Sequence, residues 1–359
     1  MTAAPPRLAL VGPMLGRNPG WVVTQGEILG DLLARDGYDV RLTSEHVGRV
    51  RRVTDILTSL VAWRNQVDVV VHMVFSGSAF RITDAASALC QRLGLPQIFV
   101  LRGGALPEFT DRNPDFVRRV LERADALVSP SGFLAHYYEE ESGFNLPVRV
   151  IPNILDIDNY PFRERITVVP RLLWMRTFHD VYHPELAVET LQELQRTHPE
   201  ATLTMAGQDK GLLAPVQALA RDLGLEDIVR FAGFLDRDGK TREFSAHDIY
   251  LNTNRVDNMP VSILESAAYG VPVVATEVGG IPYLLQDGET ALLTPDSDAP
   301  AMADAIRRLL DEDGLARRLS VNGRRLAESC AWPVVKLQWA ALFSELLASG
   351  VLSGEAIHA

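Results

Sequence analysis

The sequence predicts an α/β protein of two domains, each built on a parallel β-sheet with helices on both faces. Its 359 residues exceed what one hydrophobic core ordinarily organises. Short apolar runs rich in valine, isoleucine and leucine alternate with stretches whose apolar residues recur at helical spacing, as in strand–helix–strand units. The polar residues 154–165 interrupt this alternation, which then starts again. We therefore expect two Rossmann-like domains, with ligands bound beyond the carboxyl ends of their strands.

The alternation places each element in order. In the first half, strands are predicted at residues 7–12, 39–43, 68–75, 97–101, 126–129 and 148–151, and helices at 23–35, 50–64, 83–93, 114–123 and from Pro130-Ser131-Gly132 onward. In the second half, strands are predicted at 169–175, 202–206, 229–232, 249–251, 273–275 and 291–293. Helices are predicted at 184–196, 212–223, 242–246, after Pro260, and at 281–285, 299–310, 315–329 and 334–347.

Composition excludes several classes of function. The chain is 47% hydrophobic and carries a net charge of −11, which argues against a general nucleic-acid binder. The two cysteines, Cys90 and Cys330, indicate neither a disulfide framework nor a cysteine-rich metal site. The N-terminal residues lack the pattern of a signal peptide, and no apolar run approaches the length of a membrane span. We therefore expect a cytoplasmic protein.

Residues 257–280, DNMPVSILESAAYGVPVVATEVGG, organise the second half. They follow a predicted strand and contain a short helix, with Pro260 expected at its first position and Gly270 at its end. Asp257 precedes this helix, and Glu265 lies about two turns inside it. A helix N-terminus suits a phosphate group, so the two acids could contact opposite ends of a phosphorylated ligand. A capping role for Asp257 and a solvated position for Glu265 explain the same spacing.

The order of these segments resembles the retaining GT-B glycosyltransferases of family 4, which transfer a sugar from a nucleotide-sugar donor. The family has two glutamates separated by seven residues, and here the segment runs from Asp257 through NMPVSIL to Glu265. Ile151-Pro152-Asn153 resembles the segment between the family's domains. The glycines after TLTMA and VRFA, Gly207 and Gly233, resemble its turns on the nucleotide side. Trp332 and the last helix resemble the family's C-terminal helix, which crosses back to the first domain.

The resemblance implies a role for each donor-side residue. Glu265 would bind the ribose hydroxyls, Asp257 would face the transferred sugar, and Arg176 would bind the diphosphate. Arginine suits phosphate because its planar fork donates two parallel hydrogen bonds, and a fixed cation stabilises the leaving group. The other residues implied at the donor are the backbone amides of Asn258, Met259 and Val261, the base-side residues Gly233 and Phe234, and Gly207.

Two features depart from the family pattern on the donor side. The first acid is an aspartate, which is one methylene shorter than glutamate. The family usually has a lysine five or six positions after its arginine, where this chain has Val181 and Tyr182. Lys210 is the lysine that we expect near the site, and His179 and His183 are further candidates. The remaining lysines, Lys240 and Lys336, are expected on helical surfaces.

The first domain also departs from the pattern. The family often has a histidine after the fourth strand, but this chain has Arg102-Gly103-Gly104, where two glycines allow a ligand to approach the backbone closely. Gly20 and Trp21, in the loop after the first strand, are expected near the sugar or the acceptor, or in a simple turn. His72 is expected in the core. No GxGxxG sequence follows the first strand, so a nicotinamide dehydrogenase is not indicated.

The sequence therefore predicts a retaining glycosyltransferase of the EC 2.4 class. Its domains are expected at residues 1–157 and 158–332, followed by a crossover helix and tail at 333–359. Its partners would be a nucleotide-sugar and a glycan, lipid or small-molecule acceptor, with no cofactor and no metal. Arg49, Arg51 and Arg52 lead an amphipathic helix, which fits either peripheral contact with the inner face of a membrane or a solvated helix face. A nucleotide-sugar 2-epimerase-like isomerase and a catalytically silent nucleotide-sugar binding protein are the alternatives.

Overall fold

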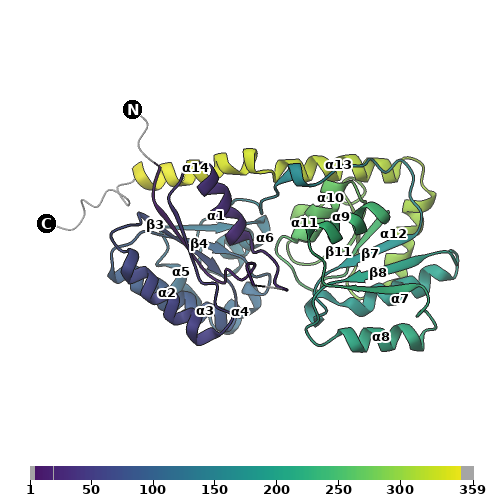
Figure 1. The fold of residues 1–359 in the computed structure, drawn as a ribbon, viewed down its shortest axis with the longest axis horizontal. Helices are drawn as coiled ribbons and strands as arrows, with labels where there is room; N and C mark the ends of the chain where they lie inside the picture. Colours follow the sequence, from purple (N-terminus) through teal and green to yellow (C-terminus); the bar gives the residue numbers. More distant parts are fainter. Residues whose placement is uncertain (1–4, 19, 349–359) are drawn as a thin grey trace. The chain divides into compact units, whose positions relative to one another are not determined.

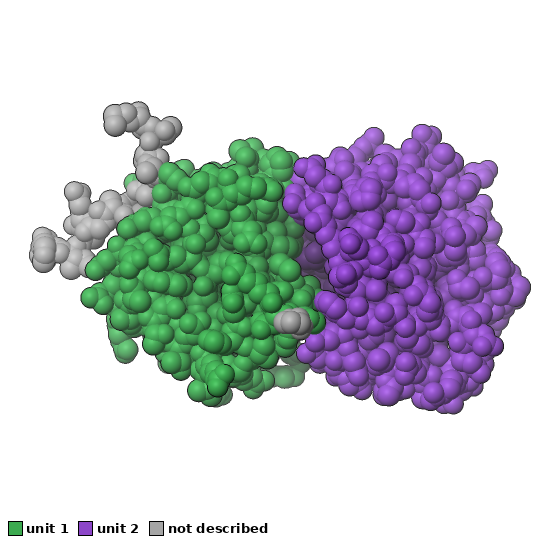
Figure 2. All heavy atoms as spheres, in the orientation of Figure 1, with its two compact units in different colours: residues 1–154, 332–359 green, residues 155–331 purple. Residues whose placement is uncertain are grey.

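The computed structural model describes residues 5–18 and 20–348, which form two compact units (Figure 2). Residues 1–154 and 332–359 belong to unit 1, and residues 155–331 belong to unit 2. The chain passes from one unit to the other between Ile154 and Leu155, and returns between Ala331 and Trp332. The sequence-based boundaries lay at 157 and 332. Each unit contains a six-stranded parallel sheet with helices on both faces, so the predicted fold class is confirmed.

The sheet of unit 1 has the strand order β2-β1-β3-β4-β5-β6. Its strands are β1 (Leu8–Val11), β2 (Val40–Thr43), β3 (Val69–Val74), β4 (Gln97–Leu101), β5 (Ala126–Ser129) and β6 (Val148–Val150). Its helices before the C-terminal one are α1 (Gln25–Arg35), α2 (Arg49–Trp63), α3 (Ser78–Arg92), α4 (Leu106–Arg112), α5 (Pro114–Leu121) and α6 (Gly132–His136), with a π-helix at Tyr137–Glu141. Side chains of β3 alternate between the faces: Val69 and Val71 pack toward α1, and Val70 packs toward α2 and α3. Helix α1 covers one face of the sheet, and α2 and α3 cover the other (Figure 1).

The C-terminal helix α14 (Trp332–Ala348) completes unit 1. Trp339 and Phe343 pack on the face of the sheet that α1 also covers, and the Trp332 indole donates to Asp36 Oδ2 at 3.1 Å. The sequence placed the start of this helix at residue 334, after Pro333, and that boundary is wrong. Proline is tolerated in the first turn of a helix, where its missing N–H would have no intrahelical partner. The predicted return of the chain to the first domain is confirmed.

The sheet of unit 2 has the order β12-β11-β10-β7-β8-β9. Its strands are β7 (Arg171–Met175), β8 (Thr202–Ala206), β9 (Val229–Gly233), β10 (Ile249–Asn252), β11 (Val273–Thr276) and β12 (Leu292–Thr294). Its α-helices are α7 (Pro184–Gln195), α8 (Leu213–Asp222), α9 (Arg237–Ala246), α10 (Val261–Tyr269), α11 (Ile281–Leu284), α12 (Ala299–Asp311) and α13 (Leu315–Ser329). Leu172 and Trp174 of β7 pack toward α7, α8 and α12, whereas Leu173 and Met175 pack toward α9, α10 and α11. The sheet is thus buried on both faces, as expected for a parallel sheet.

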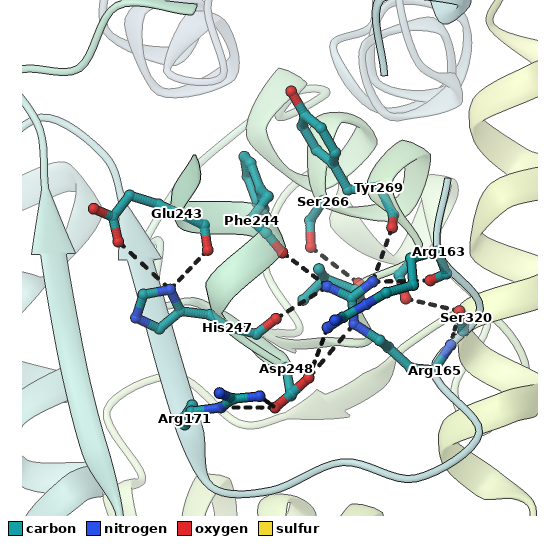
Figure 3. Close-up of polar contacts among 12 residues, drawn as sticks. Arg163, Arg165, Arg171, Glu243, Phe244, His247, Asp248, Ser266, Tyr269 and Ser320 are labelled. Atoms are coloured by element: carbon teal, nitrogen blue, oxygen red, sulfur yellow. Dashed lines mark hydrogen bonds and ion pairs between the residues drawn. The ribbon is translucent and has the colours of Figure 1, made fainter. Parts of the chain in front are cut away.

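A cluster of charged side chains, in which Asp248 and Arg165 are buried, lies at the amino ends of the strands of unit 2 (Figure 3). Asp248, just before β10, faces Arg163 at 3.2 Å, Arg165 at 3.5 Å and Arg171 at 2.6 Å. The guanidinium of Arg165 also donates to the backbone oxygens of four residues: Arg163, Phe244, His247 and Tyr269. Burial lowers the pKa of Arg165 to about 10, and the neighbouring Arg163 adds to this effect. This network joins α9, α10 and β10 at the edge opposite the carboxyl ends of the strands.

Candidate functional site

The loop between β10 and α10 brings polar groups to the carboxyl edge of the second sheet. Its backbone is fixed by Gly280 N, which donates to Asp257 O at 2.9 Å. Gly279, at φ 52°, packs so closely that an added Cβ would lie 2.3 Å from the same oxygen. Helix α10 begins at Val261, and Pro260 is its extended N-cap residue rather than the first helical position that the sequence predicted. The N-terminus of α10 therefore begins one residue later, next to Asp257.

Asp257 lies in a cluster of hydrogen-bond donors. Its Oδ2 accepts from Arg176 Nη2 at 2.6 Å and from Asn254 Nδ2 at 2.7 Å, and its Oδ1 accepts from the Asn258 amide at 2.8 Å. Burial raises the pKa of Asp257, and the Arg176 charge and the amide donors oppose that rise. The carboxylate thus accepts from a guanidinium, from a side-chain amide and from backbone amides of its own loop.

Arg176 directly follows β7 and is held from three sides. Besides Asp257, it donates from Nη1 to Ser262 Oγ at 3.2 Å, and its guanidinium carbon lies 4.1 Å from the centre of the Tyr182 ring. Burial by itself lowers the pKa of Arg176, but Asp257 and then nearby tyrosines and Glu265 raise it, and the net change is a rise. Tyr182 occupies one of the two positions where the family pattern has lysine. A rigidly held cation therefore lies beside the N-terminal turn of α10.

Gly207 explains how Arg176 is positioned. It follows β8 with φ 150°, and its N–H donates to Gly233 O at 2.8 Å. A Cβ at this position would lie 1.7 Å from the Arg176 carbonyl oxygen. Because only glycine fits here, the turn after β8 lies directly against the backbone that carries the guanidinium.

Glu265 is the second acid of α10, and its carboxylate is 10% exposed. Lys240 Nζ contacts both of its oxygens, at 2.8 and 3.0 Å, and the Tyr160 hydroxyl lies 3.4 Å from Oε1. Burial and then the charge of Glu265 raise the pKa of Tyr160, so this phenol stays protonated. Lys240 was expected on a helical surface, and it does lie on α9, but its side chain reaches the Glu265 carboxylate on α10. No local pattern in the sequence indicated this contact, because it joins side chains of two different helices.

The structure brings some of the remaining donor-side candidates to this edge. Asn258 and Met259 are buried in the loop before α10, and the Asn258 amide already donates to Asp257. Val261 is half-buried at the first position of the helix. Gly233 ends β9, and the following Phe234 is 43% exposed.

The cationic candidates after β7 and β8 lie in separate turns. Lys210 is exposed, and its backbone N–H donates to Phe178 O. His179 Nδ1 accepts from Val181 N at 3.2 Å within its own turn. His183 is buried with φ 43°, and its Nδ1 lies 3.6 Å from Asp296 Oδ1.

The candidates in unit 1 lie in loops at the carboxyl ends of β1 and β4. Gly20 has φ 79° with open space around it, and Trp21 N donates to Asn18 O at 3.1 Å. Arg102 follows β4 and donates from Nη1 to Asn153 Oδ1, and burial lowers its pKa to about 10. The next residues, Gly103 and Gly104, are half-buried.

His72 lies in the core of unit 1, and the predicted basic helix corresponds to α2. His72 is buried in β3 with its ring edge-on to Phe99, as expected for a core residue, and burial lowers its pKa to about 4. Arg49 and Arg51 are exposed in the first turn of α2. Arg52 instead turns back to donate to the carbonyl oxygens of His46 and Val47, both at 2.9 Å. In the part of the chain that the structure describes, no helix is both long and apolar enough to cross a membrane.

Comparison with known proteins places this architecture in a family. Two Rossmann-like units, with a final helix that returns to the first, define the GT-B class. Residues 157–326 match the family model of the glycosyl transferases group 1, and residues 41–159 match that of Glycosyltransferase Family 4. The chain belongs to the group 1 glycosyltransferases.

Relatives and solved structures agree with this assignment. The chain is 27% identical over 226 residues to glycogen synthase of Mycobacterium tuberculosis, covering 60% of this chain and 53% of that protein. It is 30% identical over 246 residues to alpha-D-kanosaminyltransferase of Streptomyces kanamyceticus, covering 68% and 60%. The chain thus spans about half the length of the curated relatives that it matches.

Two solved structures share the fold at low sequence identity. Sucrose-phosphate synthase of Thermosynechococcus elongatus superposes with a TM-score of 0.80 at 18% identity, over 96% of this chain and all of that one (100%). Anabaena HepE, in a complex with UDP and glucose, superposes with a TM-score of 0.75 at 16% identity, over 95% and 100%.

Proposed function

We propose that this protein is a glycosyltransferase that moves a sugar from a nucleotide-sugar donor to an acceptor, with retention of anomeric configuration. The observation that carries the proposal is Arg176, a cation 14% exposed and fixed by Asp257, Ser262 and Tyr182 beside the N-terminal turn of α10. A cation and a helix N-terminus at one sheet edge suit a diphosphate. Relatives named as glycosyltransferases, and a structural neighbour that holds UDP and glucose, support the same class of donor.

The diphosphate would use the part of Arg176 that the protein leaves open. The guanidinium has five N–H donors, and its hydrogen bonds to Asp257 and Ser262 use two of them. As the bond between the anomeric carbon and the diphosphate breaks, negative charge grows on the leaving oxygen. A cation held in place before the reaction stabilises that charge without reorganising. In a retaining transfer the acceptor oxygen bonds to the same face of the sugar, and its proton passes to the departing diphosphate.

Asp257 would act in two ways. It fixes Arg176 through Oδ2, and its carboxylate would face the transferred sugar. Glu265, about one turn inside α10, would accept hydrogen bonds from the ribose hydroxyls. Lys210, Gly233 and Phe234 are the further donor-side residues in this proposal. Gly20, Trp21 and Arg102-Gly103-Gly104 are the acceptor-side or phosphate-side residues.

The test begins with a thermal-shift screen of nucleotides and nucleotide-sugars, because a ligand that binds only the native state raises the unfolding temperature. The donor so found is then used to measure hydrolysis and transfer by wild type and by Arg176→Ala. We expect Arg176→Ala to lower turnover at least 100-fold, in the range found for removal of a transition-state donor. Arg196→Ala is the matched control, since Arg196 is an exposed arginine at the end of α7. Wild-type turnover in Arg176→Ala would refute the site assignment.

A further inference from the structure

Lys240 and Glu265 form an ion pair in which only Glu265 belongs to the segment 257–265. Lys240 lies on α9 and Glu265 on α10, and Lys240 Nζ contacts both carboxylate oxygens at 2.8 and 3.0 Å. The lysine side chain is 27% exposed, so the pair lies at the surface of the site and is open to a ligand. The Glu265 side chain is 10% exposed, and the Tyr160 hydroxyl also lies within hydrogen-bonding distance of its carboxylate.

The two helices hold this pair in a fixed geometry. Thr241, next to Lys240, hydrogen-bonds the Tyr269 hydroxyl at 2.7 Å. The Phe244 ring stacks on Tyr269, with ring centres 4.8 Å apart and planes at 18°. Tyr269 lies four residues after Glu265 on the same face of α10. The contacts of Thr241 and Phe244 with Tyr269 therefore keep α9 in register with α10, and Lys240 contacts the carboxylate.

The hydrogen-bonding capacity of the pair is not exhausted. A carboxylate offers about four acceptor positions, and Lys240 and Tyr160 use three of them, which leaves one on Oε2. An ammonium group has three N–H donors, and Lys240 uses two of them on described residues. The pair thus presents one free acceptor and one free donor side by side.

A vicinal diol is complementary to that arrangement. One hydroxyl can donate to Glu265 Oε2 while its neighbour accepts from Lys240 Nζ. A carboxylate can only accept hydrogen bonds, so if both hydroxyls bound Glu265 alone, both would have to donate. They would then compete with Lys240 for the same two oxygens. We propose that Lys240 is a specificity-determining residue for the donor, which reads one ribose hydroxyl as an acceptor while Glu265 reads the other as a donor. This inference rests on the proposed function, because the diol is that of the donor nucleotide.

The experiment removes one hydroxyl at a time. The ligands are whichever of UDP, GDP and ADP binds wild type most tightly, together with its 2′-deoxy and 3′-deoxy forms. Dissociation constants are measured by calorimetry for wild type, Lys240→Met and Lys240→Arg. Methionine keeps most of the side-chain volume and removes the charge and donors, whereas arginine keeps both. Thermal unfolding of each variant verifies that the protein is folded.

In wild type, we expect loss of either hydroxyl to weaken binding by about tenfold or more, the usual size of a hydrogen bond to a charged group. In Lys240→Met, the penalty for losing one of the hydroxyls should fall to less than twofold, while the penalty for the other persists. Lys240→Arg should retain both penalties.

Two results would overturn the inference: equal weakening of all three ligands by Lys240→Met, which indicates a structural role, or wild-type penalties in that variant. If wild type binds none of the nucleoside diphosphates, the proposed function fails, and the inference fails with it.

Discussion

The buried aspartate before β10 provides a direct test of what stabilises unit 2. Asp248→Asn keeps the shape of the side chain and removes its charge. Asp248 is 6% exposed and faces three arginines. Arg163 and Arg171 are about half exposed, at 56% and 50%, so water can replace most of what they lose. Arg165 is 3% exposed and has no access to water, so the cost is concentrated there.

The magnitude follows from that burial. Removing one partner of a buried ion pair costs about 3–5 kcal/mol, because the other charge is left uncompensated. Arg165 keeps its hydrogen bonds to four backbone oxygens, so we expect the lower end, about 3 kcal/mol. For a domain of this size, 1 kcal/mol lowers the unfolding temperature by about 2–4 °C. Asp248→Asn should therefore lower it by about 6–12 °C.

The assay must locate the loss in unit 2. Native-state hydrogen exchange, read by mass spectrometry, gives the free energy of opening separately for peptides from β10 and from β3. We expect the loss in β10 and little change in β3. Asp227→Asn is the matched control, since Asp227 is exposed, and it should change stability by less than about 0.5 kcal/mol. A loss below 1 kcal/mol in β10, or an equal loss in β3, would refute the reasoning.

Three further predictions concern stability, the site and the membrane. Burial lowers the pKa of His72 to about 4 from its ordinary 6.5, so the unfolded chain binds a proton at a higher pH than the folded chain does. The free energy of unfolding should therefore be highest above about pH 6.5 and fall by about 3 kcal/mol toward pH 4. Urea titrations at several pH values should find a smaller fall in His72→Leu. Gly207→Ala should weaken nucleoside diphosphate binding at least tenfold in calorimetry because its Cβ displaces Arg176, whereas Gly211→Ala, also at positive φ but in open space, should not. If α2 contacts anionic membranes, replacing Arg49 and Arg51 by serine should lower binding to anionic vesicles, measured by co-sedimentation, by roughly 30-fold. Binding to neutral vesicles should not change. Equal binding of wild type and the double variant to anionic vesicles would exclude that contact.

Much of the fold could be predicted because parallel sheets leave a strong pattern in the sequence. Strands buried on both faces are continuous apolar runs, and β7 and β10 were found for that reason. Helix boundaries were less certain: α3 begins at Ser78, whereas the sequence suggested residue 83. Helix α4 (Leu106–Arg112) was missed altogether. Its seven residues are too few for helical periodicity to be detected, and Pro107 in its first turn resembles a loop residue.

In the candidate site, features within one segment could be predicted from the sequence, whereas contacts between segments could not. Asp257 and Glu265 lie on one continuous segment, so their spacing and the helix between them are visible in the sequence. The contact of Lys240 with Glu265 joins two helices whose register depends on the Phe244–Tyr269 stack, and no local pattern encodes it. The contact of Gly207 with the Arg176 carbonyl is likewise tertiary, although a glycine directly after a strand indicated a close approach of some kind.

The two residues that depart from the family pattern on the donor side, Asp257 and Tyr182, both contact the guanidinium of Arg176. Asp257 contacts Arg176 through Oδ2 at 2.6 Å, and Tyr182, where a lysine is usual, covers the same group at 4.1 Å. Tyr182 is itself fixed, because the Thr253 hydroxyl donates to its carbonyl oxygen at 2.7 Å and accepts from the Trp174 indole at 2.8 Å. A flexible second cation is thus replaced by a ring that immobilises the first. An arginine whose geometry is set before the ligand arrives loses less conformational entropy on binding phosphate, which offsets part of the missing charge. Under the proposed function, the shorter acid and the missing lysine would together form one alternative way of holding a diphosphate.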